Sequence, residues 1–233
     1  MPLYKRSKIL GLISRQFFTI AIAGTHGKTT TSTILAHILQ DSGKEITAFL
    51  GGISNNYQKN VLLSTHNNIL VVEADEYDYS FLELNPDVAI ITSVDADHMD
   101  IYNTEEELQS AFIQFSSQIK EEGLLLVEES IELDFPVPKN GEKRTYSSTL
   151  NADYYADNIK IRNYEVVFDL FHKNTTLDKT CVMQDEITLS LPGIHNVSNC
   201  IAAAAIGHYL GLNMQDISNS ISSFKGIERR FEF

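Results

Sequence analysis

Cysteine is scarce in this 233-residue chain, and long apolar runs are absent. The two cysteines, Cys181 and Cys200, fall in different predicted elements without a metal-binding spacing, so we expect two reduced structural thiols. No apolar run approaches the roughly 18 residues that a membrane span needs. The N-terminus has no apolar stretch with a cleavage site, which excludes a secretory signal. We therefore expect a cytoplasmic protein without a membrane partner.

Basic residues are also few. The net charge of −13 argues against a nucleic-acid-binding surface. Residues 61–119 contain no lysine or arginine but twelve aspartates or glutamates. Some of these acidic residues simply form a solvent-exposed face. A phosphate-binding domain with such a segment would still need cations to hold a polyanionic ligand nearby, and Mg²⁺ is the obvious candidate.

Apolar runs of strand length alternate with helical patterns in the first half of the chain. Strands are predicted at 17–23, 46–50, 69–72, 88–92 and 124–127, and helices at 29–41 and behind a capping box at 104–107. This alternation predicts an α/β fold, with a mostly parallel, doubly wound sheet flanked by helices. Such sheets bind ligands at the carboxyl ends of their strands.

The pattern changes in the second half. Short strands at 153–155, 159–162, 166–171 and 187–191 predict a small antiparallel sheet attached to the main one. Helices return at 196–210 and behind Asn213. We expect the whole chain, 1–233, to form one domain.

A glycine-containing turn joins the first predicted strand to the first helix, which is the context that a phosphate-binding P-loop requires. Gly24 and Gly27 allow the backbone to turn its N–H groups inward, Lys28 offers a charge to the β- and γ-phosphates, and Thr29 offers a hydroxyl to Mg²⁺. The nucleotide-binding loop then comprises Gly24, Thr25, His26, Gly27, Lys28, Thr29 and Thr30.

This loop is shorter than the general P-loop pattern, and Ile22 stands where that pattern has its first glycine. The alternative is a glycine-rich turn with an incidental lysine. His26 either contacts phosphate or shapes the loop, and we favour shaping.

Acidic residues follow two further predicted strands. Glu73 comes directly after the run 69–72, where a second Mg²⁺ ligand belongs. Asp75, Glu76 and Asp78 follow it, and an exposed acidic loop explains Asp78 best. His98 lies among three aspartates after the strand 88–92 and could serve a metal site, a general base or a polar loop.

In these motifs the chain resembles the Mur ligases, ATP-dependent enzymes that add amino acids to the peptidoglycan precursor. Five segments match in order: G-T-H-G-K-T-T in the loop, E-A-D-E-Y-D at 73–78, D-A-D-H-M-D at 95–100, L-P-G-I-H-N-V-S-N at 191–199 and F-K-G-I-E-R-R-F-E at 224–232. The D-A-D-H-M-D segment is most similar to the branch that joins L-alanine to UDP-N-acetylmuramate.

The resemblance implies a role for each matching residue. Lys28, Glu73 and His98 would be catalytic. Thr29 and Glu73 would bind one Mg²⁺, and Glu73 and His98 a second one that touches the acceptor carboxylate. The ATP phosphates would contact the loop and Arg230, while the adenine would lie near Asn196 and Asn199. Some relatives carry a carbamylated lysine after the metal histidine, but here Ile113 and Gln114 occupy that region.

The resemblance also implies missing parts. Family members carry a UDP-binding domain before the loop, yet only 23 residues precede Gly24. They carry a further domain after the R-R-F-E segment. We therefore expect a truncated central domain that binds Mg²⁺–ATP weakly and has no ligase activity alone. Two alternatives stay open: the branch that attaches a recycled murein tripeptide, and a non-catalytic nucleotide-binding module. Folate-polyglutamate ligases fit the D-A-D-H-M-D segment less well.

Overall fold

Ten strands form one sheet in the order β10-β9-β8-β7-β6-β5-β1-β4-β2-β3. The computed structural model describes residues 3–66, 68–95, 101–148, 152–162, 165–174 and 179–228. Its strands are β1 (Phe18–Ala23), β2 (Thr47–Ser54), β3 (Lys59–Leu62), β4 (Ile69–Glu73), β5 (Val88–Ile91), β6 (Leu124–Glu128), β7 (Glu142–Ser147), β8 (Tyr154–Arg162), β9 (Glu165–Asn174) and β10 (Lys179–Leu189). Its helices are α1 (Arg6–Ser14), α2 (Lys28–Asp41), the 3₁₀ helix η1 (Tyr77–Glu83), α3 (Glu105–Ser116), α4 (Ile194–Tyr209) and α5 (Met214–Ser222).

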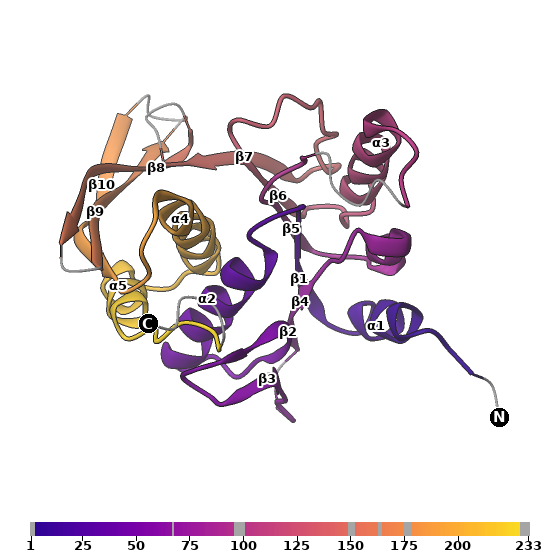
Figure 1. The fold of residues 1–233 in the computed structure, drawn as a ribbon, viewed down its shortest axis with the longest axis horizontal. Helices are drawn as coiled ribbons and strands as arrows, with labels where there is room; N and C mark the ends of the chain where they lie inside the picture. The colour runs from indigo at the N-terminus through magenta and orange to yellow at the C-terminus, as the bar shows by residue number, and fades with distance from the viewer. Residues whose placement is uncertain are drawn as a thin grey trace.

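Helices cover both faces of the parallel part of the sheet. Helices α2, α4 and α5 lie on one face, and α1, η1 and α3 lie on the other (Figure 1). Side chains of the central strand β1 alternate between the two layers. Ile20 and Ile22 enter the core with α2 and α4, whereas Ala21 and Ala23 enter the core with η1 and α3. A strand buried on both faces is a nearly continuous apolar run, which is why β1 was predictable.

The antiparallel strands continue the same sheet. Strand β8 pairs in parallel with β7 and antiparallel with β9, so the described antiparallel strands belong to the main sheet. Figure 1 shows β8, β9 and β10 curving around α4. The two strands predicted at 153–155 and 159–162 are one strand with a register shift between Asp157 and Lys160, where Asn158 adopts a φ of 53°. The predicted antiparallel attachment is confirmed. The register shift explains why the sequence pattern of β8 divides into two short strands.

Strand β2 runs further than predicted. The prediction ended it at Gly51 and Gly52, but the strand continues to Ser54. Its last residues pair with the segment 226–228: the Glu228 N–H donates to the Ile53 carbonyl at 2.9 Å, and Ser54 bridges Ile227 in antiparallel fashion. A Cβ on Gly52 would lie 2.6 Å from Ile227 Cγ2, so glycine permits this close packing.

Four elements were not predicted: α1, β3, η1 and β7. In η1, Asp78 and Tyr79 have φ angles of 54° and 55°, so the segment is kinked. Within the described ranges, no helix is long and apolar enough to cross a membrane.

His37 joins three segments that are distant in the sequence. Its Nδ1 lies 2.9 Å from the Tyr57 hydroxyl, and its Nε2 lies 2.9 Å from Ser223 Oγ. These bonds connect α2 with the turn after β2 and with the end of α5. Burial lowers the pKa of His37 below 6.5, although Asp41 opposes the shift.

We predict that His37 makes the protein less stable in mild acid. Above about pH 6.5 the imidazole is neutral in both the folded and unfolded states. Below it, the unfolded chain binds a proton that the folded chain binds only at lower pH, so the free energy of unfolding falls as pH falls. One such proton gives at most about 1.4 kcal/mol per pH unit. Denaturant unfolding between pH 7 and pH 5 measures the slope.

The variant His37→Gln is the control for this prediction, because an amide can bond to both hydroxyls without titrating in this range. Its free energy of unfolding should depend less on pH than that of the parent. Burial also lowers the pKa values of His172 and His208, so part of the slope should remain. Equal slopes in parent and variant would contradict the assignment to His37.

Candidate functional site

The carboxyl ends of three neighbouring parallel strands meet at one edge of the sheet. Strand β1 lies between β4 and β5, with Ile22 opposite Glu73 and Ala23 opposite Ile91. The loop after β1, the Glu73 carboxylate and the residues after β5 are therefore brought together by strand register. This is the position at which doubly wound sheets bind ligands.

Two glycines give the loop its conformation. Gly24 has a φ of 137° and Gly27 a φ of 85°, a region that favours glycine. A Cβ on Gly24 would lie 2.1 Å from Thr92 Oγ1, and one on Gly27 would lie 2.6 Å from Asn199 Oδ1. Both positions therefore require glycine on two grounds, the backbone angle and the close neighbour.

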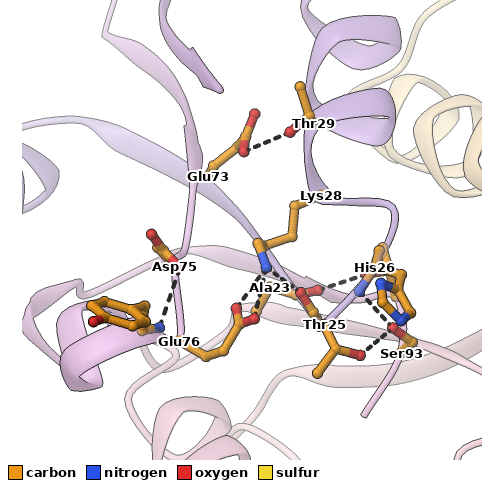
Figure 2. Close-up of polar contacts among 12 residues, drawn as sticks. Ala23, Thr25, His26, Lys28, Thr29, Glu73, Asp75, Glu76 and Ser93 are labelled. Carbon is orange, nitrogen blue, oxygen red and sulfur yellow. Dashed lines mark hydrogen bonds and ion pairs between the residues drawn. The ribbon is translucent and has the colours of Figure 1, made fainter. Parts of the chain in front are cut away.

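Ser93, which follows β5, holds the first half of the loop. The Thr25 N–H donates to the Ser93 carbonyl at 3.1 Å, and the His26 N–H donates to Ser93 Oγ at 2.9 Å (Figure 2). The Thr92 hydroxyl donates to the His26 carbonyl. The prediction that the loop amides turn inward thus needs correction, because the amides of Thr25 and His26 bond to Ser93.

The start of α2 is the part of the loop suited to an anion. Gly27 is its N-cap residue, and no described side chain caps it. The first N–H groups of a helix lack intrahelical partners and carry a partial positive charge. In α2 these belong to Lys28, Thr29 and Thr30, which were predicted to contact phosphate.

Lys28 turns back beneath the loop. Its ammonium donates to the Gly24 carbonyl at 2.5 Å and to the two carboxylate oxygens of Glu76 at 2.9 and 2.7 Å (Figure 2). The Glu76 side chain is 0% exposed and that of Lys28 is 15% exposed. The sequence alone does not distinguish Glu76 from its acidic neighbours. It is a buried ion-pair partner within a segment whose neighbours, Asp75 and Asp78, are exposed.

Glu73 is oriented by three donors. Its carboxylate accepts from the Thr29 hydroxyl at 3.1 Å, from Ser32 Oγ at 3.0 Å and from the Gly51 N–H. Figure 2 shows the Glu73 carboxylate facing Thr29, which lies at the start of α2. Oxygen ligands of this kind suit Mg²⁺, which typically uses one or two protein ligands together with phosphate and water. The pair Thr29 and Glu73 therefore fits the predicted metal.

The first turns of α4 form the opposite wall. Asn199 Oδ1 accepts from the Thr31 hydroxyl at 3.2 Å, and Asn196 Nδ2 donates to the Pro192 carbonyl at 2.7 Å. The loop and this wall both line a cavity of about 840 Å³. Its lining includes the predicted residues Thr25, His26, Gly27, Lys28, Thr29, Thr30, Asn196 and Asn199, together with Thr92, Ser93 and His195.

The structure thus brings together most of the predicted site residues. His98 and Arg230 lie outside the described residues. The His26 side chain is largely exposed, whereas its backbone bonds to Thr92 and Ser93. This arrangement agrees with a shaping role for His26. Thr92 and Ser93 were missed as loop supports, although their position directly after a strand could have indicated them.

A family model and several curated relatives match this chain, and both comparisons indicate the same family. The family model described as "Mur ligase middle domain" matches residues 22–207. The UDP-N-acetylmuramate–L-alanine ligase of Cytophaga hutchinsonii is 39% identical over 99% of this chain and 48% of its own length. The chain spans about half the length of the curated relatives it matches.

Two solved structures share the fold. The UDP-N-acetylmuramate-alanine ligase MurC of Thermotoga maritima has a TM-score of 0.79 and 27% identity, over 96% of this chain and 48% of that one. The UDP-N-acetylmuramate:L-alanyl-gamma-D-glutamyl-meso-diaminopimelate ligase of Neisseria meningitides has a TM-score of 0.81 and 22% identity, over 98% and 73% of the two chains.

Gly51 provides a test of how Glu73 is held. A Cβ at this position would lie 2.4 Å from Glu73 Oε2. We predict that Gly51→Ala lowers the free energy of unfolding by about 1–3 kcal/mol, because the carboxylate must move. In a Glu73→Ala background the same substitution should cost less than half as much, because the clash is gone. Denaturant unfolding of the four proteins measures both costs, and equal costs would show that Glu73 is not the obstacle.

Proposed function

This chain belongs to the Mur ligase family, and we propose that it is the ATP- and Mg²⁺-binding central part of a UDP-N-acetylmuramate–L-alanine ligase. The observation that carries the proposal is that Lys28 and the start of α2 line one cavity, while Thr29, on that cavity, bonds to the Glu73 carboxylate. The alanine-adding relatives at about 40% identity support the choice of substrates. The proposed location is cytoplasmic.

In the proposed reaction, the carboxylate of UDP-N-acetylmuramate attacks the γ-phosphorus of ATP. An O–P bond forms while the bond to the β-phosphate oxygen breaks, which yields an acyl phosphate and ADP. The amine of L-alanine then attacks the acyl carbon. The C–N bond forms, the nitrogen loses a proton and inorganic phosphate leaves.

The central physical difficulty of this reaction is the approach of one anion to another. Lys28 and the N–H groups at the start of α2 would reduce the repulsion by facing the phosphate oxygens. Because these donors are fixed by the strand–helix turn, little reorganisation would accompany the reaction. Asn196 and Asn199 would bound the nucleotide on the opposite side of the cavity.

Thr29 and Glu73 are the described residues that would hold Mg²⁺, which would neutralise phosphate charge when bound. Ser32 and Gly51 would keep the Glu73 carboxylate turned toward Thr29. His98, proposed as a ligand of a second Mg²⁺, and Arg230, proposed to contact phosphate, complete the expected set. Their roles rest on the motifs in which they occur.

The tripeptide-adding branch is the second candidate, because the Neisseria ligase named for such a substrate has the same fold at a TM-score of 0.81. An assay of the full-length protein with L-alanine and with the murein tripeptide separates the two. Faster ATP-dependent ligation of the tripeptide would overturn the alanine assignment. The isolated chain should bind Mg²⁺–ATP weakly without ligating either substrate.

We predict that Lys28→Ala in the full-length protein lowers alanine-dependent phosphate release by at least about a hundredfold, the usual scale for loss of one charge-stabilising donor. The phosphates would lose their main positive side chain. Circular dichroism should show that the variant is folded. Unchanged release would favour the non-catalytic nucleotide-binding module instead.

We predict that Glu73→Ala weakens the Mg²⁺ dependence of ATP binding. In the parent, calorimetric titration should show tighter ATP binding in Mg²⁺ than in EDTA. The variant should lose most of this difference, because one of two described oxygen ligands is removed. Glu83→Ala is the matched control, since Glu83 is an exposed carboxylate at the end of η1. An equal Mg²⁺ effect in parent and Glu73→Ala would contradict the metal role.

A further inference from the structure

The ammonium of Lys28 already has three acceptors. A lysine side chain offers three N–H donors. In this structure the acceptors are the Gly24 carbonyl at 2.5 Å and the Glu76 carboxylate oxygens at 2.9 and 2.7 Å. A phosphate oxygen that binds Lys28 must therefore share or displace one of them.

Contacts with two tyrosines hold the backbone at Glu76 in place. Its carbonyl accepts from the Tyr102 hydroxyl at 2.6 Å, and Tyr102 is fully buried. The Tyr102 ring lies 4.9 Å from that of Tyr79, whose hydroxyl donates to Glu107 in α3 at 2.5 Å. These contacts hold the backbone of Glu76 in place, so its carboxylate can follow Lys28 toward the cavity only by rotation of the side chain.

We propose that Glu76 is a positioning residue that competes with nucleotide phosphate for Lys28 and so weakens nucleotide binding. This inference rests on the proposed function of the loop. Carboxylate and phosphate are both anionic acceptors, and a buried carboxylate interacts strongly because the local dielectric constant is low. The competition limits how tightly ATP and ADP are held, which favours release of ADP after each turnover.

The test is nucleotide titration of the full-length protein by calorimetry. Glu76→Gln keeps the shape of the side chain and one oxygen acceptor but removes the charge. It should lower the Kd values of ATP and ADP about tenfold, equivalent to about 1.4 kcal/mol. The Kd of AMP should change much less, because Lys28 is expected to face the β- and γ-phosphates.

Asp78→Asn is the matched control. It removes one negative charge from the same segment, but Asp78 pairs with Lys5 at 2.9 Å and both side chains are more than half exposed. Asparagine also tolerates the φ of 54° at this position. The Kd values of this variant should equal those of the parent, which separates a direct effect on Lys28 from a general change in charge.

A double-mutant cycle shows whether Glu76 acts through Lys28. In a Lys28→Met background, Glu76→Gln should no longer change the Kd of ATP. A tightening that persists without Lys28, an unchanged Kd in Glu76→Gln, or weaker binding in that variant would each overturn the proposal. If Glu76→Gln does not fold, Glu76→Asp replaces it, with a smaller tightening expected because the shorter carboxylate reaches Lys28 less well.

The parent titration separates this proposal from the proposed function. If the parent protein fails to bind ATP, the nucleotide-site assignment itself is wrong, and the role of Glu76 falls with it. If the parent binds ATP and Glu76→Gln behaves like the parent, only the competition by Glu76 is wrong.

Discussion

The hydrogen-bonded register of β1 with β4 and β5 is the constraint on which the site depends. These parallel ladders align three carboxyl ends at one edge of the sheet, with Glu73 opposite Ile22 and Ile91 opposite Ala23. Because side chains alternate along a strand, a slip by one residue would turn every buried side chain to the other face. The apolar layers on both faces oppose such a slip, so the core that stabilises the fold also fixes the site.

The site itself depends on backbone contacts as much as on charged side chains. The loop is braced by Ser93, Gly24 packs against Thr92, and Gly27 packs against Asn199. Glu73 is oriented in part by the N–H group of Gly51. Such contacts leave little room for adjustment, and this is the preorganisation that charge stabilisation requires.

Much of this was predictable from the sequence. Strands buried on both faces are continuous apolar runs, so β1, β4, β5 and β6 were found close to their observed bounds. The loop, Thr29 and Glu73 could be placed together because the carboxyl ends of parallel strands share an edge. The N-caps Thr104 of α3 and Asn213 of α5 were predicted because threonine and asparagine are preferred at this position. In the structure each side chain accepts a hydrogen bond from a backbone N–H.

Other features depend on tertiary contacts that no local pattern reveals. Strand β7 has mainly polar residues and exists because it pairs with β6. Helix α1 packs on η1, where Gly11 approaches the Glu83 carbonyl. Within the acidic segment, Asp75, Glu76 and Asp78 are chemically alike, and only the path of the backbone decides that Glu76 is buried against Lys28.

The pairing of residues 226–228 with β2 has a mechanical consequence. The same strand donates the Gly51 N–H to Glu73 and, three residues further on, bridges Ile227 through Ser54. A force applied to the polypeptide near residue 228 would therefore act first on the backbone hydrogen bonds to β2. Strand β2 also orients the Glu73 carboxylate, so the same strand would transmit this force to the site.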